Sequence, residues 1–325
     1  MGYLHEELIV NTLKLRNRLV MAPVATEKTT GDGRVTNEHI DFYKEKSKNE
    51  NIGLFIVEHS YISKEGKASP KQISVADDSD IEGLSRIAEV IHSNGAKAVL
   101  QISHAGSAAS EEVTGMRAVG PSSVPNPRKG VLPETMCHDD IKKIVDKFAK
   151  AALRVKKAGF DGVEIHSAHG YFLNQFYSPL TNKRKDEYGG SLENRIRIHL
   201  EIIGEVRKTV GEDFPVFLRL GASDFTEGGT CLEDSLIAVK FMERAGIDLI
   251  DISGGFCGYA SDQLSGQGYF KGLTGPIKKA VNIPVILTGG VTSLEGAQAL
   301  LKEEAADLIG VARALLKDSS WGMSS

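Results

Sequence analysis

Short apolar runs alternate with longer amphipathic stretches along the chain, and this alternation predicts strands and helices in turn. The short runs are rich in valine, isoleucine and leucine, which is typical of parallel strands that helices cover on both faces. We predict eight such strands, at residues 18–21, 53–58, 96–102, 162–166, 215–220, 249–253, 284–288 and 308–311. Helical periodicity predicts seven helices, at residues 37–49, 81–93, 139–157, 192–210, 232–245, 272–281 and 294–302.

Three of the predicted helices end at a glycine, namely Gly95, Gly159 and Gly246. Glycine is favoured there because the chain must adopt a left-handed conformation, and each time a strand begins within a few residues. Eight strands in strict alternation with helices predict a closed (β/α)8 TIM barrel, with an open doubly wound sheet as the alternative. The sequence shows no linker, so we expect residues 1–325 to form a single domain.

Two connections are too long to be simple turns, at residues 103–138 and 167–191. The first holds four prolines and several glycines, and the second is rich in aromatic and charged residues. Both begin at the carboxyl end of a predicted strand, which is the face where barrel enzymes keep their chemistry. We therefore predict loop excursions over the C-terminal face of the barrel.

The composition is that of a soluble globular protein, since 41% of the 325 residues are hydrophobic and 25% are charged. A net charge of −4 gives no general attraction for nucleic acids or anionic membranes, so we expect neither as a partner. The three cysteines lie far apart, which argues against a disulfide framework and a cysteine-rich metal site. We expect a cytoplasmic protein, because the N-terminus lacks a signal pattern and no apolar run approaches the ~20 residues that span a bilayer.

Two histidines, His166 and His169, stand at the end of the fourth predicted strand, with Tyr171 two residues further on. Both imidazoles can face the barrel mouth and donate hydrogen bonds that polarise a carbonyl or nitro oxygen. The alternatives are a pair of structural histidines, or a metal site, for which no third ligand is evident. We therefore expect no metal. The Tyr171 phenol could supply a proton, or it could simply pack on the barrel rim.

An arginine, Arg219, stands near the end of the otherwise apolar fifth strand. A buried guanidinium needs an anion, which could be a neighbouring carboxylate or the electron-rich pyrimidine edge of a reduced flavin. Gln101, at the end of the third strand, can both donate to and accept from such a ring. After the last two strands come Gly289-Gly290 and Ala312-Arg313, which favour a phosphate site over a simple turn because barrels often bind phosphate there.

One long run closely resembles the signature of the old yellow enzyme family. It extends from His166 to Arg195 and reads HSAHGYFLNQFYSPLTNKRKDEYGGSLENR. Shorter matches occur at NRLVMAP (residues 17–23), QISHAG (101–106) and FLRL (217–220), and at both predicted phosphate loops. The resemblance covers nearly the whole chain.

The resemblance implies non-covalently bound FMN, reduction by NADH or NADPH, and reduction of the C=C bond of an α,β-unsaturated carbonyl or similarly activated alkene. It implies that His166 and His169 hold the activating oxygen and that Tyr171 protonates the α-carbon. The implied flavin contacts are Ala22, Pro23, Val24, Ala25, His59, Gln101, His166 and Arg219 at the ring, and Gly289, Gly290, Ala312 and Arg313 at the phosphate.

Three positions depart from the family pattern. Ala25 stands where a threonine or cysteine usually bonds the flavin, with Thr26 beside it as a partial replacement. Ser107 stands where arginine is common. His59 stands where a small residue is common, so a bulky polar group is expected at the border of the flavin.

Other functions stay open. One is a flavin-binding barrel with little ene-reductase activity, and another is a flavin-independent, phosphate-binding lyase or isomerase. No cysteine cluster resembles that of larger relatives with an iron–sulfur cluster, so we expect electrons to come directly from NADH or NADPH. We expect the loops at residues 103–128 and 254–268 to set the substrate, and leave a homo-oligomer open.

Overall fold

A closed barrel of eight parallel strands forms the centre of the protein, in a computed structural model that describes residues 3–260 and 264–323. The strands follow the order β10-β11-β12-β3-β4-β5-β8-β9 around the barrel. This closure confirms the predicted (β/α)8 barrel and rules out the open sheet. The strands are β3 (Leu19–Met21), β4 (Leu54–Tyr61), β5 (Lys97–Ser103), β8 (Gly162–Ser167), β9 (Val216–Gly221), β10 (Leu249–Ser253), β11 (Val285–Thr288) and β12 (Leu308–Val311).

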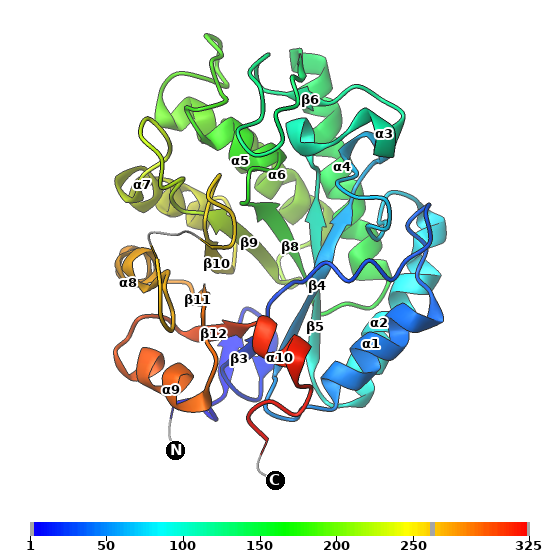
Figure 1. The fold of residues 1–325 in the computed structure, drawn as a ribbon, viewed down its shortest axis with the longest axis vertical. Helices are drawn as coiled ribbons and strands as arrows, with labels where there is room; N and C mark the ends of the chain where they lie inside the picture. The colour runs from blue at the N-terminus through cyan, green and yellow to red at the C-terminus, as the bar shows by residue number, and fades with distance from the viewer. Residues whose placement is uncertain (1–2, 261–263, 324–325) are drawn as a thin grey trace.

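Helices surround the barrel, with α1 and α2 on one side and α7, α8 and α9 on the other (Figure 1). All seven predicted helices are confirmed to within two residues at either end, whereas the last helix, α10, was not predicted. The predicted stops at Gly95, Gly159 and Gly246 are also confirmed, because all three have positive φ. The helices are α1 (Asn37–Ser47), α2 (Ile81–Ser93), α4 (His138–Lys157), α6 (Leu192–Val210), α7 (Leu232–Arg244), α8 (Lys271–Ala280), α9 (Leu294–Lys302) and α10 (Arg313–Lys317).

The predicted excursions contain short elements of their own. The connection after β5 holds η3 (Gly106–Ala108), α3 (Glu111–Thr114), β6 (Val119–Gly120) and β7 (Glu134–Thr135), and the one after β8 holds α5 (Phe172–Tyr177). In Figure 1, α3, α5 and β6 lie at the same end of the barrel. Two further 3-10 turns are η1 (Lys64–Gly66) and η2 (Asp78–Asp80). Among the described residues, no helix is both long and apolar enough to cross a membrane.

The inside of the barrel is apolar at its N-terminal end, where a hairpin closes it. The hairpin consists of β1 (Leu8–Val10) and β2 (Leu13–Leu15), which pair antiparallel and were not predicted from the sequence. Leu15 packs in one cluster with inward residues of the barrel strands, such as Leu54 and Phe217. A separate, larger cluster fills the space between the strands and the helices.

Truncation of Leu15 to alanine tests whether the hairpin belongs to the core. Leu15 is fully buried, so Leu15→Ala should lower the free energy of unfolding by about 2–5 kcal/mol, measured by denaturant titration. Ile9 on the same hairpin is 65% exposed, and Ile9→Ala should change stability by less than about 0.5 kcal/mol. Equal effects of the two substitutions would show that the hairpin does not close the core.

Candidate active site

Strand register brings three polar side chains level at the C-terminal end of the barrel. His166 on β8 is the partner of Arg219 on β9, and Arg219 is the partner of Asp251 on β10. Because side chains alternate along a strand, Arg219 faces inward like Phe217, which belongs to the interior cluster. These three side chains therefore form a polar row above the apolar filling of the barrel.

The two predicted histidines and Tyr171 are brought together in this mouth. The ring centroids of His166 and His169 lie 5.0 Å apart, and those of His166 and Tyr171 lie 5.2 Å apart. His169 has a left-handed backbone, with φ of 60°, and its N–H donates to the Gly254 carbonyl at 3.2 Å. Its carbonyl accepts a 2.7 Å hydrogen bond from Arg128 Nη1, so both peptide groups of His169 are held in place.

Burial and nearby positive charge fix the protonation states of these groups. Burial, followed by the neighbouring His169 and Arg219, lowers the pKa of His166 well below its ordinary value. Burial and Arg219 do the same to the pKa of His169, whose Nε2 lies 2.7 Å from Ser253 Oγ. Burial raises the pKa of Tyr171. At neutral pH the site therefore holds neutral imidazoles and a protonated phenol.

Arg219 has a carboxylate neighbour, as the ion-pair alternative anticipated. Its Nε lies 3.2 Å from Asp251 Oδ2, and both side chains are buried. Neither of these two atoms has a well-aligned hydrogen-bond partner among the described residues. Asp251 also accepts a 3.1 Å hydrogen bond from Thr288 Oγ1 on the next strand. The ion pair is present, but Arg219 Nε and Asp251 Oδ2 remain without hydrogen-bond partners among the described residues.

A second carboxylate, Glu164, lies two residues before His166 on β8 and is completely buried. Its Oε1 accepts a 2.7 Å hydrogen bond from Gln101 Nε2, while its Oε2 has no partner in the described part of the chain. Burial and the charge of Asp251 raise the pKa of Glu164 to about 8. The contact also orients the Gln101 amide, whose carbonyl oxygen is left as an acceptor.

The segment after β3 is placed beside the mouth, and Thr26 in this segment is bonded to Glu58. The Ala22 N–H donates to the Val311 carbonyl at 3.0 Å, which ties the start of the segment to β12. Pro23 and Val24 are partly buried and Ala25 is exposed. Thr26 donates from its hydroxyl to Glu58 Oε1 at 2.6 Å and from its N–H to Glu58 Oε2 at 3.0 Å. The Thr26 hydroxyl therefore donates its proton to Glu58, and its use as a partial replacement for the flavin contact stays a prediction.

The two predicted phosphate loops lie side by side, since β11 pairs with β12. Gly289 and Gly290 both have positive φ, and a Cβ at Gly289 would come within 2.6 Å of the Tyr269 ring. The glycines thus also allow Tyr269 to approach closely. Arg313 is exposed and donates from Nη2 to the Tyr269 hydroxyl at 3.4 Å. A cavity of about 390 Å³ opens here, lined by Ala260, Leu264, Ser265, Gly266, Gln267, Tyr269, Gly290, Thr292 and Arg313.

The residues present fit FMN at both ends. Buried polar atoms without partners are rare in proteins, and among the described residues four of them lie at the mouth: His166 Nδ1, Glu164 Oε2, Arg219 Nε and Asp251 Oδ2. A flavin ring offers donors and acceptors to such atoms. The glycine pair and Arg313 offer backbone N–H groups and a charge to a phosphate. Ala312, directly before Arg313, is the N-cap of α10.

Sequence reasoning missed several residues that support the site. Glu164 and Asp251 are charges in apolar strands, the same signal that singled out Arg219, and each stands at an inward position of its strand. Ser253 and Arg128 hold His169 through contacts between segments distant in sequence, which no local pattern reveals. Ser107 accepts a hydrogen bond from Asn126 within the excursion.

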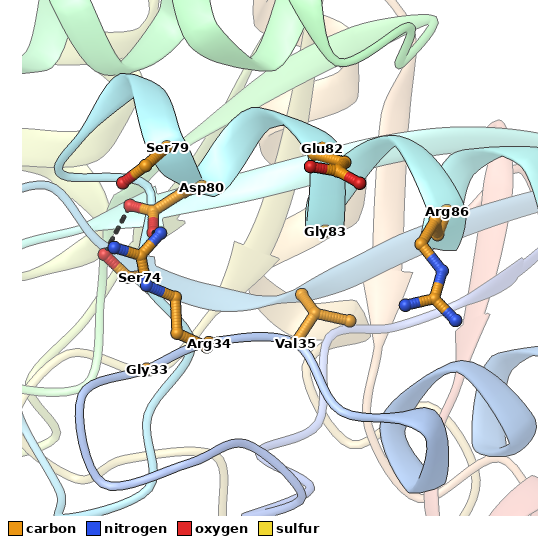
Figure 2. A pocket seen from close by; sticks show the side chains of 9 residues that line it. All are labelled: Gly33, Arg34, Val35, Ser74, Ser79, Asp80, Glu82, Gly83 and Arg86. Atoms are coloured by element: carbon orange, nitrogen blue, oxygen red, sulfur yellow. Dashed lines mark hydrogen bonds and ion pairs between the residues drawn. The ribbon is translucent and has the colours of Figure 1, made fainter.

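Other clusters in the described residues carry no further argument for this site. A second cavity of about 190 Å³ lies between the loop at residues 33–35 and the start of α2 (Figure 2). Its Arg34 pairs with Asp80 at 3.0 Å, and none of the predicted site residues lines it. A third group at the surface, His138, Asp186 and Glu187, brings three potential metal ligands together, but Asp186 is already bonded by Arg184.

Substitution of Glu164 by glutamine tests the charge state of the mouth. Because the folded-state pKa is about 8 and the ordinary value is 4.5, the folded protein binds an extra proton between these values. Wild-type stability should therefore fall, relative to Glu164→Gln, as the pH rises from about 5 to about 8. The measurement is the free energy of unfolding at several pH values, with the exposed Glu227→Gln as the control. Parallel curves for wild type and Glu164→Gln would contradict the assignment.

The chain is similar to known flavin oxidoreductases over nearly its whole length. Residues 4–324 match the NADH:flavin oxidoreductase / NADH oxidase family. The chain is 41% identical to an NADPH dehydrogenase of Halalkalibacterium halodurans, covering 98% of this chain and 92% of that protein. It is 39% identical to an NADH oxidase of Thermoanaerobacter brockii, covering 96% of this chain but 49% of that protein, so it spans about half the length of this relative.

Solved structures agree with these matches. An old yellow enzyme homologue from Zymomonas mobilis superposes with a TM-score of 0.85 at 28% identity, covering 98% of this chain and 90% of that one. Morphinone reductase in complex with tetrahydroNAD gives a TM-score of 0.83 at 26% identity, covering 97% and 88%. These matches confirm, at the level of the family, the predicted old yellow enzyme resemblance, the FMN cofactor and a reduced nicotinamide as electron donor. The chain belongs to the NADH:flavin oxidoreductase / NADH oxidase family.

Proposed function

We propose that this protein is an ene-reductase, which takes hydride from NADH or NADPH and reduces the C=C bond of an α,β-unsaturated carbonyl or similarly activated alkene. The observation that carries the proposal is the juxtaposition of two neutral imidazoles and a protonated phenol in one barrel mouth. FMN, when bound, supplies the hydride carrier between the nicotinamide and the alkene.

The histidine pair activates the substrate. Neutral His166 and His169 each offer a ring N–H, and two donors that converge on one carbonyl or nitro oxygen stabilise the negative charge that develops on it during hydride addition. The Ser253 hydroxyl, 2.7 Å from His169 Nε2, orients that ring. The low pKa of both rings keeps them neutral, so each ring offers one N–H donor.

Tyr171 supplies the proton. Hydride addition at the β-carbon leaves the α-carbon in need of a proton, and the Tyr171 hydroxyl, beside His166 in the mouth, retains its proton at neutral pH. Its ring contacts His166, so a substrate oxygen held by the histidines and a carbon facing Tyr171 belong to the same small space. Position, rather than a lowered pKa, therefore determines its use.

The remaining residues hold the cofactor in this proposal. Gln101 and Arg219 face the pyrimidine edge of the flavin, where the Gln101 carbonyl accepts and the guanidinium attracts negative charge. The backbone from Ala22 to Ala25 borders the ring. The phosphate is held by Gly289, Gly290, Ala312 and Arg313.

Purified protein should be yellow, should be bleached by NADH or NADPH, and should regain its colour when 2-cyclohexenone is added. Stopped-flow absorbance of the flavin measures both half-reactions. A flavin that is reduced but is not reoxidised by enones, enoates or nitroalkenes would leave a flavin-binding barrel without ene-reductase activity. Protein that does not take up FMN would contradict the proposal altogether.

Substitution of Tyr171 by phenylalanine should slow only the second half-reaction. Loss of a positioned general acid typically costs about 10²–10⁴-fold, so reoxidation by 2-cyclohexenone should fall by that order while reduction by the nicotinamide is unchanged. Tyr3 is exposed near the N-terminus, and Tyr3→Phe serves as the matched control. Equal reoxidation by wild type and Tyr171→Phe would exclude Tyr171 as the proton donor.

A further inference from the structure

A third histidine, His59, reaches the mouth through an irregularity in β4. The register of β4 against β5 shifts between Val57 and Ser60, so Glu58 and His59 lie in a bulge. Bulges re-aim side chains and are common next to active sites. Glu58 turns away from the mouth and pairs with His39 at 2.8 Å, whereas the His59 ring turns towards the site.

The His59 ring contacts two of the proposed catalytic residues. It stacks on Tyr171, with centroids 5.5 Å apart and planes 18° apart, and it meets His166 edge-on at 6.3 Å. His166 also meets His169 at 5.0 Å. His166 is therefore the ring that both other histidines contact.

Hydrogen bonds settle which nitrogen of His59 carries the proton. The Ala68 N–H donates to Gln72 Oε1 at 2.6 Å, which identifies Gln72 Nε2 as the amide nitrogen. This nitrogen donates to the His59 carbonyl at 3.0 Å and lies 2.9 Å from His59 Nδ1. Nδ1 therefore accepts, and the ring proton of neutral His59 stands on Nε2.

The Nε2–H donor has no hydrogen-bond partner within the described residues, and the side chain is only partly buried. Burial and Arg219 lower the pKa of His59, which agrees with a neutral ring. The mouth therefore holds three imidazoles, although one substrate oxygen has room for two convergent donors, because each carbonyl oxygen has two lone pairs.

We propose that His59 is a substrate-binding residue whose Nε2–H contacts a second oxygen of the activating group, so that the site favours two-oxygen groups such as nitro or carboxylate over the single oxygen of an enone. This inference rests on the proposed ene-reductase function and names its substrate class. The Gln72 contact holds the ring as a donor towards the substrate.

The test compares two probes of the same ring size, 1-nitrocyclohexene and 2-cyclohexenone, on the FMN-loaded enzyme. His59→Phe keeps a ring that can stack on Tyr171 but removes the N–H. One lost hydrogen bond corresponds to at most about a tenfold change, so kcat/KM for 1-nitrocyclohexene should fall up to about tenfold while that for 2-cyclohexenone changes less than about twofold. The ratio of the two kcat/KM values is the readout, because flavin reduction by the nicotinamide is common to both probes.

Two further variants check how the result for His59→Phe is interpreted. Gln72→Met leaves the His59 ring in place but lets the proton move to Nδ1, so it should produce a smaller loss in the same direction. His138→Phe, at an exposed histidine on α4, is the matched control and should leave the ratio of the two probes unchanged.

The outcomes separate the inference from the function it rests on. An equal loss for both probes in His59→Phe would show that His59 only supports Tyr171 and His166, and would overturn the inference. Unchanged kcat/KM for both probes, or a greater loss for 2-cyclohexenone than for 1-nitrocyclohexene, would show that the N–H does not contact substrate. Either result would also overturn the inference. If wild-type enzyme is reduced by the nicotinamide but reduces neither probe, the ene-reductase proposal fails as well.

Discussion

A single buried guanidinium, Arg219, placed between two buried carboxylates is the interaction on which the mouth of the barrel depends. Arg219 pairs with Asp251 at 3.2 Å, and its charge also lowers the pKa of Glu164, although burial and Asp251 raise that pKa more strongly. Buried charges are costly unless they are paired and hydrogen-bonded. Burial raises the pKa of both Glu164 and Asp251, and Arg219 lowers both, so the guanidinium offsets part of the cost of burying the two carboxyl groups.

The charge of Arg219 also affects the groups above it in the barrel mouth. Burial, with a smaller contribution from the positive charge of Arg219, lowers the pKa of all three histidines in the mouth, so they act as neutral hydrogen-bond donors rather than as cations. The same guanidinium can stabilise a flavin that becomes negative on reduction. The attraction of Arg219 for an anionic ring edge therefore depends on the protonation state of Glu164. Glu164 also orients the Gln101 amide.

The barrel could be predicted from the sequence because strand and helix periodicities are local, and helix-ending glycines such as Gly159 mark where each unit turns. The N-terminal hairpin escaped prediction because three-residue strands are too short to show a period. The long run from His166 to Arg195 pointed to the histidine pair and Tyr171, which the structure places in contact. The roles given to these residues stay proposals.

The less predictable part of the site depends on contacts between distant segments. The bulge at residues 58–59 sends Glu58 outward, where it accepts a hydrogen bond from Thr26, the residue next to Ala25. The Tyr269 ring against Gly289 likewise gives the phosphate loop a packing constraint that a glycine pair alone does not reveal. Within the substrate loop expected at residues 254–268, residues 261–263 lie outside the described ranges.

Arg219 would hold the ring of FMN and Arg313 would hold its phosphate. The most direct measurement is the dissociation constant of FMN and of riboflavin, which lacks the phosphate, for wild type and Arg313→Ala by fluorescence titration. Arg313→Ala should weaken FMN binding about tenfold or more, because a charge-assisted hydrogen bond is lost, and should leave riboflavin binding unchanged. Equal weakening of both ligands, or of neither, would contradict it.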